Sequence, residues 1–467
     1  MSDDWKIYRL GQITDWFSGG TPRKNIDRYW NGDIPWISAS SMSNNRISTS
    51  DMKITNEGLK SGSKLANKDD ILLLVRGSIL HQKIPVGIVM NEVSYNQDVK
   101  RIKVKDNLNP WFLLYWFIGN EKTLLRKVDV TGIGAGKFDT DFLQNYPISL
   151  PSLKEQKIIV DIVKSLDDKI YLNNQINQTL ESIAQAMFKS WFIDFEPVRA
   201  KIAAKQEGKN SELAAMCAIS GTSEAEIEQM AEENLAELRA TAALFPDELV
   251  ESELGEVPKG WEVSTVGDQI QTVGGATPST KNVEFWDNGT HHWTTPKDLS
   301  NLTDKILLNT DRKITNAGLK KISSGLLPKD TVLMSSRAPV GYLALAKIEV
   351  AINQGYIAIL PNTKYSAEYL IQWCEANMAE IKGRASGTTF QEISKKNFRE
   401  INFICPDEKI VASYTKTVRT LYDEIALKAK ESQSLVDIRD TLLPKLLSGE
   451  IDVSDLGSET EYEYSTE

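Results

Sequence analysis

Cysteine, histidine and long apolar runs are all scarce in this 467-residue sequence. The three cysteines are widely scattered, and of the three histidines only His291 and His292 are adjacent; they do not form a disulfide framework or a metal-ligand pattern, so we expect no metal site and no redox chemistry. The longest apolar run, 111–118, is far shorter than the roughly 20 residues that cross a bilayer. The first residues also lack the apolar stretch of a signal peptide. We therefore expect a soluble, cytoplasmic protein without membrane contact.

Basic residues are outnumbered overall, which gives a formal net charge of -10. The excess of acid is local, however. Residues 207–257 carry 2 Lys and Arg against 13 Asp and Glu, and residues 448–467 carry none against 7. The stretches 1–150 and 258–405 are mildly basic, with 20 against 16 and 17 against 14. The overall acidity therefore does not exclude binding to the phosphates of a nucleic acid.

A long internal repeat is present in the sequence. KITNEGL at 53–59 matches KITNAGL at 313–319, and GGTP at 19–22 matches GGATP at 274–278, always in the same order. Between these matches the two copies diverge freely. Each copy consists of short strand-like runs separated by Gly, Pro, Asn and Ser, with helical stretches at 110–119 and 366–376 that look buried. This pattern predicts two similar mixed α/β domains of about 150 residues, an α+β fold class.

Each copy is followed by a long stretch in which apolar residues recur every seven positions, as in a coiled-coil seam. A helix from about Lys154 to Ile193 would be roughly 60 Å long and would need a partner helix, and two matching seams favour pairing with each other. Asn173 interrupts the first seam, and we expect it to fix the register. The residues expected in this coiled coil are Ile159, Leu166, Asn173, Leu180, Met187, Val411, Val418, Leu421, Ile425, Leu435 and Leu442.

Motifs for catalysis are missing from the sequence. GIGAGKF at 132–138 resembles a phosphate-binding loop, but Thr131 stands where that motif needs its first glycine, and a Phe follows Lys137 in place of Ser or Thr. We find no adenine-methylation motif, no methyl-donor loop and no carboxylate cluster repeated in both copies. The sequence therefore predicts neither a nucleotide site nor an active site.

Three phrases of the sequence closely resemble the specificity subunits of type I restriction-modification systems: AQAMFKSWFIDFEPVRAK at 184–201, LFPDELVESELGEVPKGW at 244–261 and RDTLLPKLLSGEI at 439–451. The similarity spans nearly the whole chain. It implies two target recognition domains, each reading one half of a bipartite DNA sequence. It also implies an antiparallel coiled coil, with the domains in a pseudo-two-fold arrangement, that sets the spacing of the halves and docks two methylation subunits.

The same resemblance implies that this chain is non-catalytic and binds no cofactor itself. S-adenosylmethionine would be bound by the methylation subunits, and ATP and Mg would be used by restriction subunits. The expected organisation is a first recognition domain (1–151), a central long helix (152–206), an acidic linker with helix (207–257), a second recognition domain (258–406), a distal long helix (407–447) and an acidic disordered tail (448–467).

Readout of DNA requires side chains that reach base edges, surrounded by cations that contact phosphates. Loops that diverge between the matched segments are the natural place for such residues, and a solvent-exposed position without base contact is the alternative for each of them. The candidates are Ser38, Ser40, Asn44, Asn45 and Arg46 after the shared Trp36; Thr294, Thr295 and Lys297 after Trp293; Arg76 and Arg337 at strand ends; and Lys137, Arg384, Ser386 and Thr388 in a Gly-rich loop.

Aromatic residues that persist where the loops differ are expected in the core rather than stacked on bases. They are Trp36, Trp293, Phe138 and Phe390. Two other classes of function remain open from the residues alone. One is a self-contained DNA-modifying enzyme, and the other is a coiled-coil scaffold protein without DNA specificity.

Overall fold

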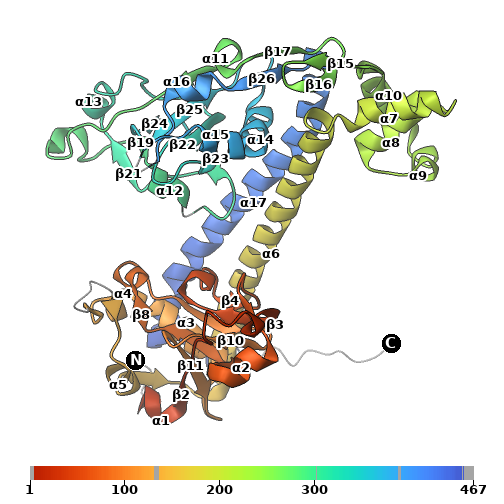
Figure 1. Ribbon diagram of the computed structural model, residues 1–467. Coiled ribbons are helices and arrows are strands. Elements are labelled where there is room, and N and C mark those ends of the chain that lie inside the picture. The colour runs from red at the N-terminus through yellow and green to blue at the C-terminus, as the bar shows by residue number, and fades with distance from the viewer. Residues whose placement is uncertain (1–4, 131–135, 301, 388–390, 455, 457–467) are drawn as a thin grey trace. The chain divides into compact units, whose positions relative to one another are not determined.

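The computed structural model describes residues 5–130, 136–300, 302–387, 391–454 and 456. The chain forms two compact units, the first made of residues 1–169 and 434–467 and the second of residues 170–433. Each unit contains one copy of the repeat and part of two long helices, α6 (Leu153–Phe192) and α17 (Glu408–Ser448) (Figure 1). Among the described residues, no helix is both long and apolar enough to span a membrane.

Both units are built around a five-stranded sheet with the same strand order. In the first unit the order is β2 (Thr14–Ser18), β11 (Val99–Val104), β7 (Ile71–Leu74), β9 (Val86–Val89) and β4 (Arg46–Ile47). In the second it is β18 (Gln271–Val273), β25 (Tyr356–Leu360), β22 (Thr331–Ser335), β23 (Leu343–Ala346) and β20 (Ile306–Leu307). In each sheet the last two strands pair in parallel and the other neighbours are antiparallel. The repeat in the sequence is therefore a repeat of topology.

The smaller sheets also correspond. The first unit has β5 (Lys53–Ile54), β3 (Trp30–Ile37), β10 (Val93–Tyr95) and β6 (Lys64–Ala66) in one sheet, and the second has β21 (Arg312–Ile314), β19 (His291–Thr294) and β24 (Val350–Ile352). Each unit adds an antiparallel pair, β1 (Lys6–Arg9) with β14 (Pro147–Leu150) and β17 (Glu262–Thr265) with β26 (Asn402–Cys405). A further sheet in the first unit joins β12 (Asp129–Val130), β13 (Gly136–Lys137) and β8 (Arg76–Gly77).

Short helices follow in a similar, though not identical, order in the two units. The first unit has α1 (Leu10–Ile13), α2 (Asn56–Gly62), α3 (Pro110–Gly119), α4 (Glu121–Leu125) and α5 (Thr140–Gln144), with 3-10 turns η1 (Asp27–Tyr29), η2 (Ala39–Ser41) and η3 (Ser78–His81). The second has α11 (Val266–Gln269), α12 (Pro296–Ser300), α13 (Asn316–Leu319), α14 (Ala367–Ala376), α15 (Met378–Gly383), α16 (Lys395–Arg399) and η4 (Val283–Phe285). Helices α3 and α14 are largely buried, which confirms the prediction for 110–119 and 366–376.

The shared KITNxGL motif marks the start of a helix in each unit. The side chains of Thr55 and Thr315 cap α2 and α13 by accepting a hydrogen bond from the backbone N–H of Gly58 (3.1 Å) and Gly318 (3.2 Å). A Cβ atom at Gly58 would collide with the carbonyl oxygen of Tyr29, so only glycine fits at this position. Helix capping and close packing therefore explain why both repeats contain this motif, whichever residues the diverging loops contain.

Helices α6 and α17 pack against each other in antiparallel orientation within each unit (Figure 1). In the second unit, Asn177 Nδ2 donates to the carbonyl oxygen of Ile425 (3.2 Å), and the Tyr414 hydroxyl donates to the carbonyl oxygen of Ala184 (3.3 Å). In the first unit, Arg439 Nη1 lies 2.9 Å from Asp167 Oδ1. Later residues of α6 therefore contact earlier residues of α17. This is the pattern of two antiparallel helices, and it confirms the predicted coiled coil.

The predicted seam residues differ in how completely they are buried. Ile159, Asn173, Val411, Val418 and Ile425 are buried, while Leu166, Leu180, Met187, Leu421, Leu435 and Leu442 are half-buried. Asn173 Nδ2 donates to Glu431 Oε2 (3.0 Å) and to Ser432 Oγ (3.3 Å) on α17, so the polar seam residue contacts its partner helix. Its role in fixing the register stays a prediction.

An aromatic cluster attaches the second unit's domain to the two long helices. Phe192 of α6 meets the rings of Tyr369 on α14 and Tyr414 on α17, with both pairs of centroids 5.1 Å apart and the rings nearly perpendicular. Phe188 lies against the same two rings. Edge-to-face packing of this kind adds to the free energy of burying the rings.

Two expected segments need correction. Segment 152–206 is two helices rather than one, because α6 ends at Phe192 and α7 (Glu196–Gln206) begins after Phe195, whose φ of 54° cannot continue a helix. The buried Phe195 ring packs on Trp261 with centroids 5.5 Å apart, which holds the chain in this turn.

Segment 207–257 is folded rather than a linker with some helix. It contains α8 (Ser211–Ser220), α9 (Glu224–Glu228), α10 (Glu232–Leu244), β15 (Leu249–Ser252) and the start of β16 (Gly255–Pro258). A small core of buried apolar side chains holds the helices together: Ala215, Met216, Ile227 and Ala242. The expected disordered tail at 448–467 lies largely outside the described residues, since 455 and 457–467 are not among them.

Replacing Phe192 by Ala should lower the free energy of unfolding of the chain by about 3–5 kcal/mol, because the change leaves a cavity between α6, α14 and α17. Denaturant titration followed by circular dichroism measures this. Ile183→Ala on the same helix is the control, since that side chain is 44% exposed and its loss should change stability little. Equal effects of the two substitutions would contradict the packing described above.

Candidate nucleic-acid interface

Two of the candidate cations are brought together in the first unit. Arg76 of β8 and Lys137 of β13 are direct register partners across an antiparallel pair, although 61 residues separate them in the sequence. Both side chains are exposed, and within the described part of the chain no ion pair involves either of them. Neighbouring exposed cations of this kind suit contact with phosphates or with guanine edges.

The corresponding place in the second unit brings the candidates together around an acidic residue. Arg337 and Ser386 both form backbone bridges with Glu392, and Arg337 Nη1 lies 3.7 Å from Glu392 Oε2. Arg384 is bound to Glu380 through its Nε and Nη2 atoms at 3.0 and 2.8 Å. The topology is therefore shared, but in this copy carboxylates neutralise the arginines.

The loop after Trp36 carries polar side chains that are partly occupied locally. Ser38 and Ser40 are within hydrogen-bonding distance of each other, with Oγ atoms 2.9 Å apart. Asn44 and Asn45 are exposed; Asn44 Oδ1 accepts from a backbone N–H of its own loop, and Asn45 Nδ2 donates to the carbonyl oxygen of Val86 (2.8 Å). These contacts order the loop and leave its surface polar.

Arg46, at the end of that loop, points toward helix α6 instead of outward. Its Nη2 atom lies 2.5 Å from Asp168 Oδ1, its guanidinium lies over the Trp111 ring at 5.4 Å, and its side chain is 15% exposed. Burial opposes ionisation of Asp168, but hydrogen bonds from Lys164 and Arg46 outweigh it and lower the pKa of that carboxyl. A base contact by Arg46 would require this ion pair to break, so the structure gives Arg46 a packing role that the sequence did not indicate.

The loop after Trp293 contains one candidate that cannot contact DNA in this structure. Thr294 is completely buried, and its hydroxyl lies 3.0 Å from the Tyr356 hydroxyl, so the prediction for this residue is wrong. The Thr295 side chain bonds to Asp298 (2.9 Å) at the start of α12. Lys297 on α12 is exposed and stays a candidate.

The shared aromatic anchors are core residues, as expected. Trp36, Trp293 and Phe138 are between 1% and 4% exposed. The indole N–H groups of Trp36 and Trp293 donate to the carbonyl oxygens of Gly20 (3.1 Å) and Ala276 (3.2 Å), so the same bond occurs in both units. Thr388 and Phe390, as well as Thr131, lie outside the described residues.

Comparison with known proteins agrees with this duplicated architecture. Residues 2–182 and 258–436 match the family described as type I restriction modification DNA specificity domain. The HindI specificity subunit of Haemophilus influenzae is 33% identical, over 96% of this chain and 100% of its own length. This chain belongs to the family of type I restriction-modification specificity subunits.

Further relatives have the same description. The MjaIX specificity subunit of Methanocaldococcus jannaschii is 26% identical over 97% of this chain and 95% of its own length. The crystal structure of a type I S subunit from M. genitalium is 15% identical, covers 96% of this chain and 97% of that chain, and has a TM-score of 0.49. As a specificity subunit, the chain contributes DNA-sequence specificity and is not itself an enzyme.

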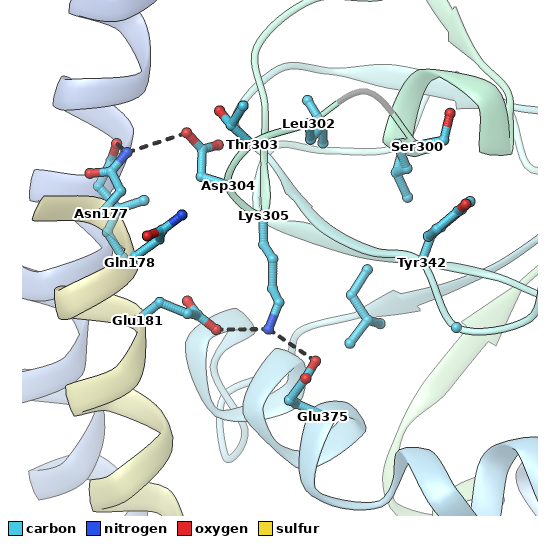
Figure 2. A pocket seen from close by; sticks show the side chains of 14 residues that line it. Asn177, Gln178, Glu181, Ser300, Leu302, Thr303, Asp304, Lys305, Tyr342 and Glu375 are labelled. Carbon is cyan, nitrogen blue, oxygen red and sulfur yellow. Dashed lines mark hydrogen bonds and ion pairs between the residues drawn. The ribbon is translucent and has the colours of Figure 1, made fainter. Parts of the chain in front are cut away.

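The structure of the specificity subunit also reveals polar residues that the sequence did not single out. Lys305 is bound to Glu181 of α6 and Glu375 of α14, and Asp304 accepts a hydrogen bond from Asn177 (Figure 2). Burial lowers the pKa of Lys305, but the two carboxylates outweigh it and raise that pKa above its ordinary value. Burial also raises the pKa of Asp304. Only one feature of the sequence could have indicated this polar group: Asn177 occupies a seam position, seven residues before Ala184.

Substituting both Arg76 and Lys137 by Ala should weaken binding of the specificity subunit to duplex DNA. The slope of log K against log salt should fall by about 1 for each phosphate that the variant no longer neutralises, because fewer counterions are released. Fluorescence anisotropy over a range of salt concentrations measures the slope. Lys60→Ala, an exposed lysine on α2 outside this sheet, is the control. An unchanged slope in the double variant would remove this strand pair from the interface.

Proposed function

We propose that this specificity subunit recognises a bipartite DNA target, with one half read by each repeat and the gap set by the paired helices. The observation that carries the proposal is that two units of identical sheet order each contain a stretch of the same antiparallel helix pair. Two readers attached to one stiff element address two sites on a duplex at a fixed separation. Divergence of the loops between the repeats gives each half its own sequence.

The proposal includes partners and cofactors. The chain directs two methylation subunits, and in addition restriction subunits, to the target. S-adenosylmethionine is bound by the methylation subunits, and ATP with Mg by the restriction subunits, so this chain contributes recognition without chemistry. In support, the relatives that match nearly the whole chain are described as specificity subunits.

Exchange of residues 1–150 for the same region of another specificity subunit should change one half of the target and leave the other half and the gap unchanged. The measurement is methylome sequencing of cells that carry the chimera together with its methylation subunits. A scaffold without DNA specificity would give no change at all. Purified chain alone, given S-adenosylmethionine and DNA, should transfer no methyl groups, whereas transfer would support a self-contained enzyme.

Matched insertions of seven residues, between 169 and 170 in α6 and between 433 and 434 in α17, should lengthen only the gap. Seven helical residues add about 10.5 Å, the length of about three base pairs, and preserve the heptad phase. The same sequencing reads the gap directly. A matched pair of alanine substitutions at the exposed positions Leu172 and Leu427 controls for changes to the helix surface. An unaltered gap in the insertion variant would contradict the role of the helices.

A further inference from the structure

In the second unit, the end of the diverging loop is tied to helix α6 by one side chain. Lys305 Nζ lies 2.9 Å from Glu181 Oε1 on α6 and 2.9 Å from Glu375 Oε2 on α14 (Figure 2). The backbone carbonyl of Lys305 accepts a hydrogen bond from the N–H of Leu345 in β23 (2.7 Å). A single residue therefore joins the loop, the edge of the five-stranded sheet and the long helix.

The preceding residue adds a second link, which reaches both long helices. Asn177 Nδ2 of α6 donates to Asp304 Oδ2 (3.2 Å) and to the carbonyl oxygen of Ile425 in α17 (3.2 Å). Asp304 Oδ1 accepts from the backbone N–H of Ile306 in β20 (3.1 Å). Asn177 is 3% exposed, so these hydrogen bonds are largely shielded from bulk solvent.

Polar links act beside apolar packing in this connection between the loop and the helices, since Ile306 and Ile425 of α17 belong to one buried cluster. A cavity of about 390 Å³ lies beside the links, lined by Asn177, Glu181, Asp304 and Lys305 among others. Apolar side chains therefore fill only part of the space here. Half-buried ion pairs with fixed partners resist displacement, because removing one partner leaves the other charge uncompensated. The Lys305 side chain is 23% exposed and that of Glu181 is 17% exposed.

The first unit has a counterpart at the equivalent place. Arg46 is the first residue of β4, and Lys305 immediately precedes β20, the strand at the same position of the second sheet. Arg46 is bound to Asp168, and Asp168 also accepts from Lys164 Nζ (2.7 Å). Both diverging loops thus end in a cation that binds a carboxylate of α6, at positions 168 and 181.

We propose that Arg46 and Lys305 are positioning residues that fix the two recognition loops on helix α6, so that the register of the helix determines the gap that the loops accept. The inference rests on the proposed function, because it concerns the geometry of the two half-sites. It assigns neither residue a base contact. Loss of the Lys305 link should therefore broaden the accepted gap without changing the sequence of either half.

The test uses the full chain assembled with its methylation subunits and a library of duplexes with two randomised halves and varied gaps. The wild type should select one gap. In Lys305→Met, the preference for that gap over gaps one base pair shorter or longer should be at least tenfold smaller. Lys305→Arg, which keeps the charge, should restore most of that discrimination. Lys416→Met is the control, because it breaks the exposed pair of Lys416 with Glu237 in the same unit.

Hydrogen exchange provides a readout that is independent of DNA. Backbone amides at 302–307 should exchange at least tenfold faster in Lys305→Met, while those of the central strand β22 should keep their wild-type rates and report an intact fold. Unchanged exchange at 302–307, or an unchanged gap preference, overturns the proposal. An altered half-site sequence also overturns it, since Lys305 would then read bases. If the wild type selects no bipartite site, the proposed function fails, and the exchange rates still decide whether Lys305 holds the loop.

Discussion

The antiparallel packing of α6 against α17 is the interaction on which the rest of the structure depends. Each helix is about 40 residues long and carries an apolar stripe that a small domain cannot cover over its full length. Pairing buries these stripes, and the same helices then provide the surface on which each recognition domain packs. In the second unit, Phe188 and Phe192 contribute to both tasks, since their rings contact α14 of the domain and α17 of the pair.

The two repeats show how one topology can carry different loops and different charges. Strand order, the capped KITNxGL helices and the tryptophan hydrogen bonds are common to both, because packing and backbone geometry require them. The charged residues at equivalent places differ between the two domains. Arg76 and Lys137 are exposed cations, whereas Arg337 and Arg384 lie beside Glu392 and Glu380. A phosphate or base that approached the second set would compete with these carboxylates, so the two faces differ in electrostatic character while their folds agree.

The repeat, the buried helices and the coiled-coil seams could be predicted from the sequence, because each leaves a periodic or duplicated pattern. The environments of single side chains could not. Thr294 reads as a polar loop residue, yet the strand β19 extends to it and turns its hydroxyl toward Tyr356. The sequence predicts a DNA contact for Arg46, but in the fold its guanidinium binds Asp168, which lies 122 residues away in the sequence. The segment 207–257 resembles a linker because glutamates dominate its composition, although a few apolar residues suffice to close its core.

We expect the polar residues in the helix seam to favour one register of the pair at a cost in stability. A purely apolar seam with a seven-residue spacing is nearly satisfied again after a slip of one heptad, which would shift one helix by about 10.5 Å. In the second unit such a slip would take Asn177 away from Ile425 and Asn173 away from Glu431. A buried amide N–H left without an acceptor costs about 1–3 kcal/mol, so we expect the loss of these two hydrogen bonds to disfavour the slipped register. Under the proposed function, a helix pair that measures a gap needs a single register, and these two asparagines are the residues that we expect to favour it.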